Sequence, residues 1–244
     1  MWDVVQPEIY KGGGSGAHLK LIALLPCLSH LKLIKFVIVR IMSKKRLQVW
    51  SVRFDIKIND DSGSNADLTL DTWKPRLAPG YYYFGPAATN ASTQQRFGLI
   101  VKELVKDTLV DIDQWNQVWN DHGSGTSTDY ALWRGSCADP NYVALASFFT
   151  RSHNPPSVND TQGIKAVHKD VLISAAAYPE IWNDKGTGAN EDGSVWGVDG
   201  GPTPKSIETG AFIAVSGYFA PPRDAYNINR DKVVVSNYGT TSPL

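Results

Sequence analysis

Apolar and polar positions alternate along much of this chain at the two-residue spacing of β-strands. The segment QVWSVRFDIKIND at 48–60 is the clearest example. Three further runs, at 80–89, 141–150 and 211–220, are rich in aromatic and β-branched residues, which favour strands. The 14 prolines and 21 glycines favour short strands joined by turns. The pattern predicts an all-β protein.

The only candidate helices are the segments 99–118 and 164–178. Helical periodicity is poor over most of the chain, however. We therefore interpret both segments as pairs of strands.

Two glycine-rich segments show internal repetition. NDHGSGTSTDYALW at 120–133 and NDKGTGANEDGSVW at 183–196 share their Asn-Asp, Gly, Asp and Trp positions at a constant offset of 63 residues. A weaker copy, NDDSGSNADLTLDTW, runs from 59 to 73. A fixed period is the signature of a repeat architecture, so we predict three internal repeats of about 60 residues.

The third copy is shortened near 231–237, and the strand at 48–60 supplies a matching segment. We expect this N-terminal strand to lie beside 231–237 and to complete the third repeat, which would leave few free sheet edges. Three such units around a pseudo-threefold axis describe a β-prism. The sequence therefore predicts a single β-prism domain over 42–244.

Residues 1–41 differ in composition from the repeats. KGGGSG at 11–16 is typical of a linker, and the apolar stretch at 19–41 is interrupted by Lys, His and Arg. These charges argue against a transmembrane span, which needs about 20 apolar residues. We expect this segment to lie outside the fold, as an extension from an incorrect start site with Met42 as the true start. A helix on a membrane surface is the alternative.

Composition limits the partners. Lys plus Arg equals Asp plus Glu, 24 against 24, so electrostatics give no reason to expect a nucleic-acid partner. Cys137 is the only cysteine of the expected domain, which favours a reducing compartment, cytoplasmic or vacuole-associated, over secretion. Two glycosylation sequons, at Asn90 and Asn159, point the other way. The oligomeric state stays open.

No pattern of catalytic residues is present. The sequence has no nucleophile elbow, P-loop, zincin helix or cysteine pair at zinc spacing. We therefore expect a protein that is not an enzyme and needs no organic cofactor. A hydrolase with an unfamiliar site is the alternative.

The repeated loops carry the candidate metal ligands. Asp121 and Asp129 in one loop, and Asp184 and Asp192 with Glu191 in the other, offer the oxygens that Ca²⁺ prefers, and glycine permits the bends. Asp and Asn also close ordinary turns by hydrogen bonding to nearby backbone. A calcium site and a plain turn both remain open at this stage.

The same loops are candidates for carbohydrate binding. We expect Asp121, Asp129, Asp184 and Asp192 to bind hydroxyl groups. The residues that close the two repeats are tryptophans, and aromatic rings stack on apolar ligand faces. Trp133 and Trp196 therefore complete the predicted ligand-binding set, although packing in a core is the simpler role for any one of them.

Several segments resemble a known family. DYALWRGSCADPNYVALASFF at 129–149, IKAVHKDVL at 164–172 and IWNDKGTG at 181–188 resemble, in order, a strand pair, a CVH segment and a loop of the vacuolar protein sorting-associated protein 62 family. That family is related to plant proteins of domain of unknown function 946. The resemblance covers most of 46–235 and implies a link to vacuolar protein sorting, with no established catalytic activity.

Three functional hypotheses follow from these observations. The first is a recognition protein, associated with glycans or membranes, that binds a glycan or a protein through the repeated loops. The alternatives are an intracellular scaffold for vacuolar sorting or trafficking, and a toxin-like effector.

Expression of 42–244 alone tests the domain boundary. If residues 1–41 lie outside the fold, the shortened protein should unfold cooperatively with the same melting temperature as the full chain. Circular dichroism during heating would measure this, and loss of the cooperative transition would contradict the boundary.

Overall fold

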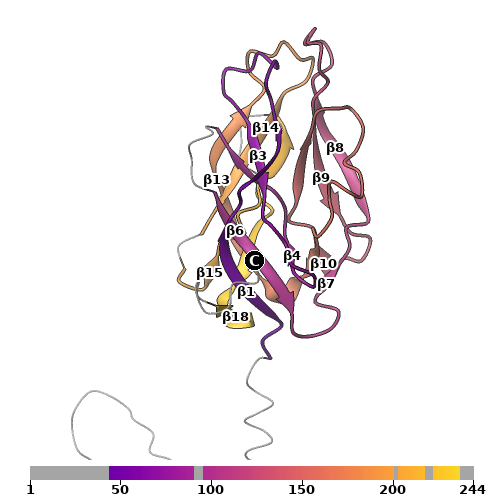
Figure 1. Cartoon of the computed structure of the whole chain (residues 1–244). Helices are drawn as coiled ribbons and strands as arrows, with labels where there is room; N and C mark the ends of the chain where they lie inside the picture. The colour runs from indigo at the N-terminus through magenta and orange to yellow at the C-terminus, as the bar shows by residue number, and fades with distance from the viewer. Residues whose placement is uncertain (1–43, 91–95, 201–202, 218–221, 237–244) are drawn as a thin grey trace, which may run out of the picture. The chain divides into compact units, whose positions relative to one another are not determined.

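The computed structural model describes residues 44–90, 96–200, 203–217 and 222–236 (Figure 1). The chain divides into two units, 1–42 and 43–244, and all described residues belong to the second. The expected extension at 1–41 thus lies outside the described residues. Within them no helix has the length and apolar character needed to cross a membrane.

The all-β prediction is confirmed for the described residues. Their only helices are two short 3₁₀ turns, Lys169–Val171 and Arg230–Lys232. The segments 99–118 and 164–178 contain strands, as expected from the weak helical periodicity.

One half of the domain consists of three similar groups of antiparallel strands. In each group, a hairpin carries one of the repeated loops, and a third strand pairs with the second strand of the hairpin. The groups are β2 (Ile56–Asp60), β3 (Asp71–Lys74) and β5 (Ala87–Thr89); β8 (Gln114–Asn120), β9 (Ala131–Ser136) and β11 (Ser147–Thr150); and β13 (Leu172–Asn183), β14 (Gly193–Asp199) and β16 (Ile213–Ser216).

The other half contains the remaining strands. They form three sets: β18 (Val233–Ser236), β1 (Leu47–Arg53), β6 (Phe97–Glu103) and β4 (Tyr82–Tyr83); β10 (Tyr142–Val143), β12 (Ala166–His168) and β7 (Leu109–Val110); and β15 (Ser206–Ile207) with β17 (Ala225–Asn229) and the first part of β13. Figure 1 shows β1, β7, β10, β15 and β18 below β3, β8, β9 and β14.

The first and last described strands are neighbours. β1 pairs in parallel with β18, with Leu47 opposite Val233. The predicted position of the first strand beside 231–237 is therefore correct. Our treatment of 48–60 as one strand was wrong, because the chain leaves one sheet at Arg53 and enters another at Ile56, with Phe54 fully buried between them.

Two of the aromatic runs, 80–89 and 141–150, are also divided into two short strands each. In 80–89, β4 and β5 are separated at Gly85, whose φ is +151°. A Cβ atom there would lie 2.9 Å from the Cα of Ala146. Glycine thus permits a close backbone approach between neighbouring groups of strands at this bend.

A cluster of aromatic side chains supports the loops from below. Trp119 and Trp182 are fully buried, and their rings meet edge to face with centroids 5.4 Å apart. Tyr130 stacks on Phe149 with centroids 5.7 Å apart. Trp119, Trp182 and Phe149 lie near the ends of strands β8, β13 and β11, and Tyr130 directly precedes β9. The apolar core therefore continues up to the repeated loops.

Substitution of Gly193 by alanine should disturb this cluster. A Cβ atom at Gly193 would overlap the ring of Trp119. We expect Gly193→Ala to lower the free energy of unfolding by about 1–3 kcal/mol, the usual cost of overpacking, and to change the tryptophan fluorescence. Urea unfolding followed by fluorescence would measure both effects.

Gly125→Ala is a control for this measurement. Gly125 has open space around its missing Cβ but a φ of +71°, so the variant should cost about 1 kcal/mol through backbone strain, without a change in fluorescence. A Gly193→Ala protein as stable as the wild type would contradict the packing of Trp119 against this position.

Candidate functional site

The three repeated loops meet at one end of the domain, at the top of Figure 1. We call 61–70, 121–130 and 184–193 together the loop end. The loops form a closed ring of contacts: Tyr130 donates from its hydroxyl to the Ser62 carbonyl, the Asn190 N–H donates to the His122 carbonyl, and the Asp67 N–H donates to the Lys185 carbonyl. Each loop therefore contacts both of the others.

One buried aspartate closes each loop. Asp61, Asp121 and Asp184 each accept a hydrogen bond from the backbone N–H nine residues later, over 2.9, 3.0 and 2.8 Å. Each of them also donates its own backbone N–H to the carbonyl of that later residue, over 3.0 Å in every loop. The glycine two positions after each aspartate has a φ of +93° or +94°. The turn interpretation thus accounts for the shared Asp and Gly positions.

This pattern corrects the alignment of the first repeat. The sequence comparison matches Asn59-Asp60 with Asn120-Asp121, but the closing residue is Asp61. Strand bulges confirm the shift, because β2, β8 and β13 have theirs just before Asn59, Trp119 and Trp182 respectively. Asn59 therefore occupies the position that tryptophan holds in the other two groups.

The tryptophans of this position connect neighbouring loops. Trp182 donates its indole N–H to the Asp61 carboxylate over 2.9 Å, and Trp119 donates to the Glu191 carbonyl over 2.8 Å. Asn59 is too short to do the same for the second loop and donates to the Phe149 carbonyl instead. Among the described residues, the carboxylate of Asp121 instead has Ser124, Thr126, Tyr130 and His153 as its hydrogen-bond partners.

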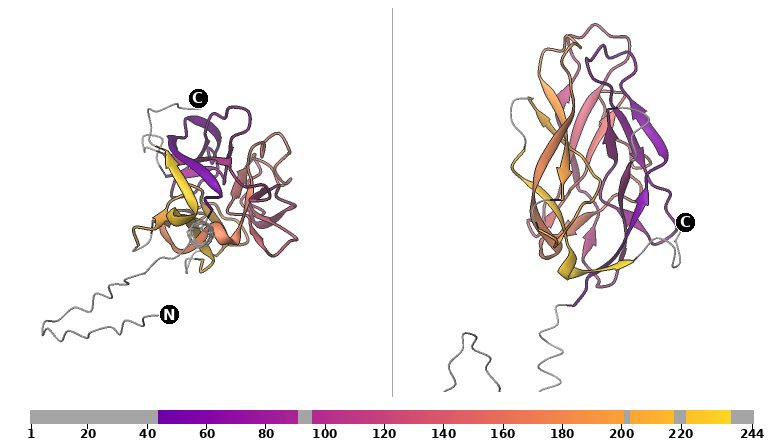
Figure 2. Two further views of the ribbon diagram at one scale, coloured as in Figure 1. Left: turned by 90° about the horizontal axis from the view of Figure 1, so that it is seen from below. Right: turned by 90° about the vertical axis from the view of Figure 1, so that its left-hand side faces the viewer.

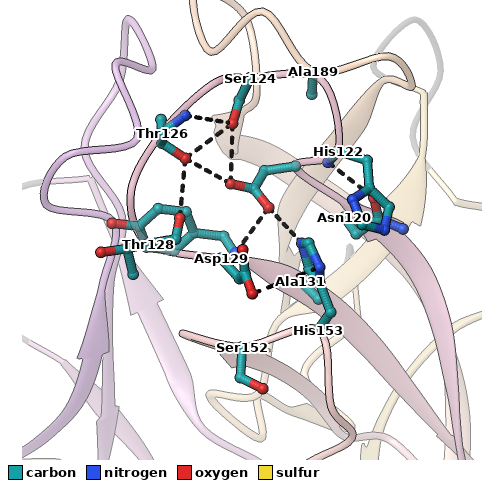
Figure 3. Close-up of polar contacts among 12 residues, drawn as sticks. Asn120, His122, Ser124, Thr126, Thr128, Asp129, Ala131, Ser152, His153 and Ala189 are labelled. Atoms are coloured by element: carbon teal, nitrogen blue, oxygen red, sulfur yellow. Dashed lines mark hydrogen bonds and ion pairs between the residues drawn. The ribbon is translucent and has the colours of Figure 1, made fainter.

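His153 occupies this vacant side of Asp121. Its Nε2 lies 2.6 Å from Asp121 Oδ1, and its Nδ1 lies 3.8 Å from Asp129 Oδ2. On the other side, Ser124 and Thr126 donate their hydroxyls to Asp121 Oδ2 over 3.2 and 2.9 Å. Figure 3 shows His153 beside Asp129, and Ser124 and Thr126 on the opposite side of the group.

The environments of the closing aspartates change their acidity in different directions. Burial raises the pKa of Asp61 and of Asp184 against the hydrogen bonds from Leu70 and Gly193, and the charge of Asp192 raises the pKa of Asp184 further. For Asp121, burial is opposed by hydrogen bonds from Tyr130, His153, Thr126 and Ser124. Together these lower its pKa. The second loop is therefore the one that stabilises a negative charge.

The structure brings together part of the predicted metal set. Asp121, Asp129 and His153 each offer one ligand atom, all within 4.8 Å of one another, and they are the only such group among the described residues. Asp184 and Asp192 belong to another loop and are outside this group. Sequence analysis missed His153, although the pairing of Thr150 with Ala131 places 151–153 next to 128–130.

Trp133 and Trp196 do not face a ligand at the loop end. Both are buried, with 7% and 8% of their surface exposed. Their indole N–H groups donate to Thr150 and Ser194. The predicted stacking role for these two rings is therefore corrected to a role in the core and in strand pairing.

The comparisons with known proteins found similarity to solved structures. No family model matches the chain, and no curated protein matches it. The crystal structure of GNIP1Aa from Chromobacterium piscinae is similar, with a TM-score of 0.67 and 26% sequence identity over 79% of this chain. The matched part is 38% of that chain, so this chain spans less than two fifths of the length of that protein.

The two kinds of closing aspartate should respond to acid in opposite ways. Asp121 has a folded pKa below its ordinary value of 3.8, so its ionised form stabilises the fold above that pH, and this stabilisation is lost as the pH falls further. Asp184 has a folded pKa above 3.8, so its ionisation weakens the fold at neutral pH, and protonation removes that penalty as the pH falls toward 3.8.

Asp121→Asn and Asp184→Asn test this contrast. The stability difference between the wild type and Asp121→Asn should shrink below about pH 4, whereas wild type should gain stability relative to Asp184→Asn between about pH 7 and pH 4. Urea unfolding at a series of pH values would measure both. Parallel pH profiles for the two variants would contradict the assigned pKa directions.

Proposed function

We propose that residues 42–244 form a β-prism of three repeats around a pseudo-threefold axis, with the N-terminal strand completing the third. The equivalent hairpins and the common closure by Asp61, Asp121 and Asp184 support this. The pairing of β1 with β18 supports the completion of the third repeat. The left view of Figure 2, which looks at the domain from below, shows its early, middle and late parts grouped around a common centre.

The function that we propose for this domain is recognition without catalysis, through the loop end. The main support for this proposal is the closed ring of contacts among the three loops, which lies on the aromatic core. Such a ring presents polar side chains on a rigid scaffold, which is where binding residues usually lie. Exposed groups of the loop end include Asn65, Asp67, His122, Asp129, Lys185 and Asn190.

A glycan is the ligand class that these groups suit best. Carboxylates accept hydrogen bonds from sugar hydroxyls, and amide groups both donate and accept them. The exposed groups carry acids and amides from all three loops, so one ligand can contact several loops. A protein partner with exposed hydroxyl and amide groups is the alternative.

The solved neighbour fits a role as a module. In GNIP1Aa the similar region is 38% of the chain, so this type of fold occurs there joined to further sequence. The resemblance to the vacuolar protein sorting-associated protein 62 family remains a prediction from the quoted segments, and so does the sorting role that it implies.

A glycan array with the full chain tests the proposed function. The double variant Asp67→Ala/Asn190→Ala removes one acid and one amide from two different loops. For any glycan that the wild type binds, this variant should bind at least about tenfold more weakly, which corresponds to about 1.4 kcal/mol. Both side chains are exposed, so the variant should keep the melting temperature of the wild type.

Gln114→Ala/Asp199→Ala is the matched control. It also removes one amide and one acid, both exposed, from the ends of β8 and β14 that are remote from the loops. An equal loss of glycan binding in both double variants would rule out the loop end as the binding site. If the wild type binds no glycan on the array, the glycan proposal is wrong and a protein partner is the alternative.

A further inference from the structure

We propose that Asp121, Asp129 and His153 form a site for a divalent transition-metal ion of the zinc class. The group combines two carboxylates with an imidazole, and their ligand atoms lie within 4.8 Å of one another. Nitrogen from imidazole suits zinc, copper and nickel, whereas Ca²⁺ takes six to eight oxygen ligands. This proposal replaces calcium as the expected ion and does not depend on the glycan proposal.

The carboxylate of Asp121 is already held in position for such an ion. Tyr130 donates its N–H to Oδ1, while Ser124 and Thr126 donate hydroxyls to Oδ2. With 4% of its surface exposed, the residue cannot turn freely, and Oδ1 is left facing His153. Hydrogen bonds that orient a ligand in this way are a regular part of metal sites.

His153 adds more than a replacement for the missing tryptophan. An indole offers one N–H, which would suffice to complete the hydrogen bonds of Asp121. A neutral imidazole can instead offer the lone pair of Nε2 to an ion while its proton stays on Nδ1, which lies 3.8 Å from Asp129 Oδ2. The side chain of Asp129 is largely exposed, so it has room to turn toward an ion bound beside the histidine.

The distances need only a small adjustment. Zinc bonds of about 2.0–2.1 Å in a tetrahedral site hold neighbouring ligand atoms about 3.3 Å apart. His153 Nε2 and Asp121 Oδ1 are 2.6 Å apart, so the ring must move outward by less than an ångström, toward the solvent to which it is partly exposed. The ion then replaces the proton between the two atoms.

His122 is a candidate for the fourth ligand of the ion. The ring of His122 lies with its centroid 4.1 Å from that of His153, and His122 is exposed. Either this imidazole or a water molecule completes a tetrahedral set. An open fourth position also allows an external ligand to reach the ion.

This donor set is specific to the second loop. The position of Asp129 is filled by Thr69 in the first loop and by Asp192 in the third. Counted from the strand pairings, the positions that correspond to 151–153 are 90–92, Asn-Ala-Ser, and 216–218, Ser-Gly-Tyr. None of these residues is His, Cys, Asp or Glu. The three loops thus share their closure but differ in metal-binding capacity.

Titration of the full chain with Zn²⁺, followed by calorimetry and by the melting temperature, tests the site. The wild type should bind one ion that is lost in His153→Gln, and the melting temperature should rise by about 5–10 °C at a hundredfold excess over the dissociation constant. Asp129→Asn should bind at least tenfold more weakly. Ca²⁺ should cause no comparable rise.

Asp192→Asn is the matched control, since it makes the same change at the corresponding position of the third loop. It should bind Zn²⁺ as the wild type does. Co²⁺ supplies an independent readout, because its visible absorption reports a tetrahedral site with nitrogen ligands, which His153→Gln should abolish. His153 and Asp129 are partly or largely exposed, so both variants should fold.

Two outcomes would overturn the proposal. Binding that persists unchanged in His153→Gln would assign the ion to other residues of the chain. No binding of Zn²⁺ or Co²⁺ by the wild type would leave His153 as a hydrogen-bonding replacement for tryptophan only.

Discussion

The loop end depends on a buried carboxylate that holds a backbone N–H nine residues away. Without Asp61, Asp121 or Asp184, the corresponding loop would leave a buried donor without its partner, at a cost of about 1–3 kcal/mol. The closure also brings the first and last residues of each loop together, so that the loops can contact each other. Stability and the presentation of polar groups therefore have a common origin.

Departures from symmetry give the three loops different chemistry. Two of them receive an indole from the preceding group of strands, but the shorter Asn59 leaves Asp121 without one. His153 takes that place and brings a partly exposed imidazole ring to the carboxylate of Asp121. The presence of Asn59 at the tryptophan position of the first group is thus linked to a different environment for Asp121 in the second loop.

The sequence predicted much of this, for reasons that are physical. Alternating apolar residues and the many glycines were sufficient for the all-β class, because they report local backbone preference. The fixed offset identified the loops. The sequence did not reveal that Asp61 rather than Asp60 closes the first loop, because the segment reads Asn-Asp-Asp and its Asn-Asp matches the other repeats one residue too early.

The candidate site was predicted less completely than the fold. Asp121 and Asp129 were found through their repeated positions, whereas His153 has no counterpart at the repeat offset and becomes a neighbour only through strand pairing. Trp133 and Trp196 were assigned to a ligand surface because composition cannot tell a buried ring from an exposed one. Contacts across repeats are the information that a single sequence lacks.

The parallel pairing of β1 with β18 has a consequence for biosynthesis. Leu47 and Val233 are partners although 186 residues separate them in the chain. At about 5–20 residues per second, the ribosome needs about 10–40 s to make that interval. During this time β6 can already protect one edge of β1, but the other edge remains open to pairing with a second nascent chain. Chaperone contact with this edge would serve the protein most in that interval.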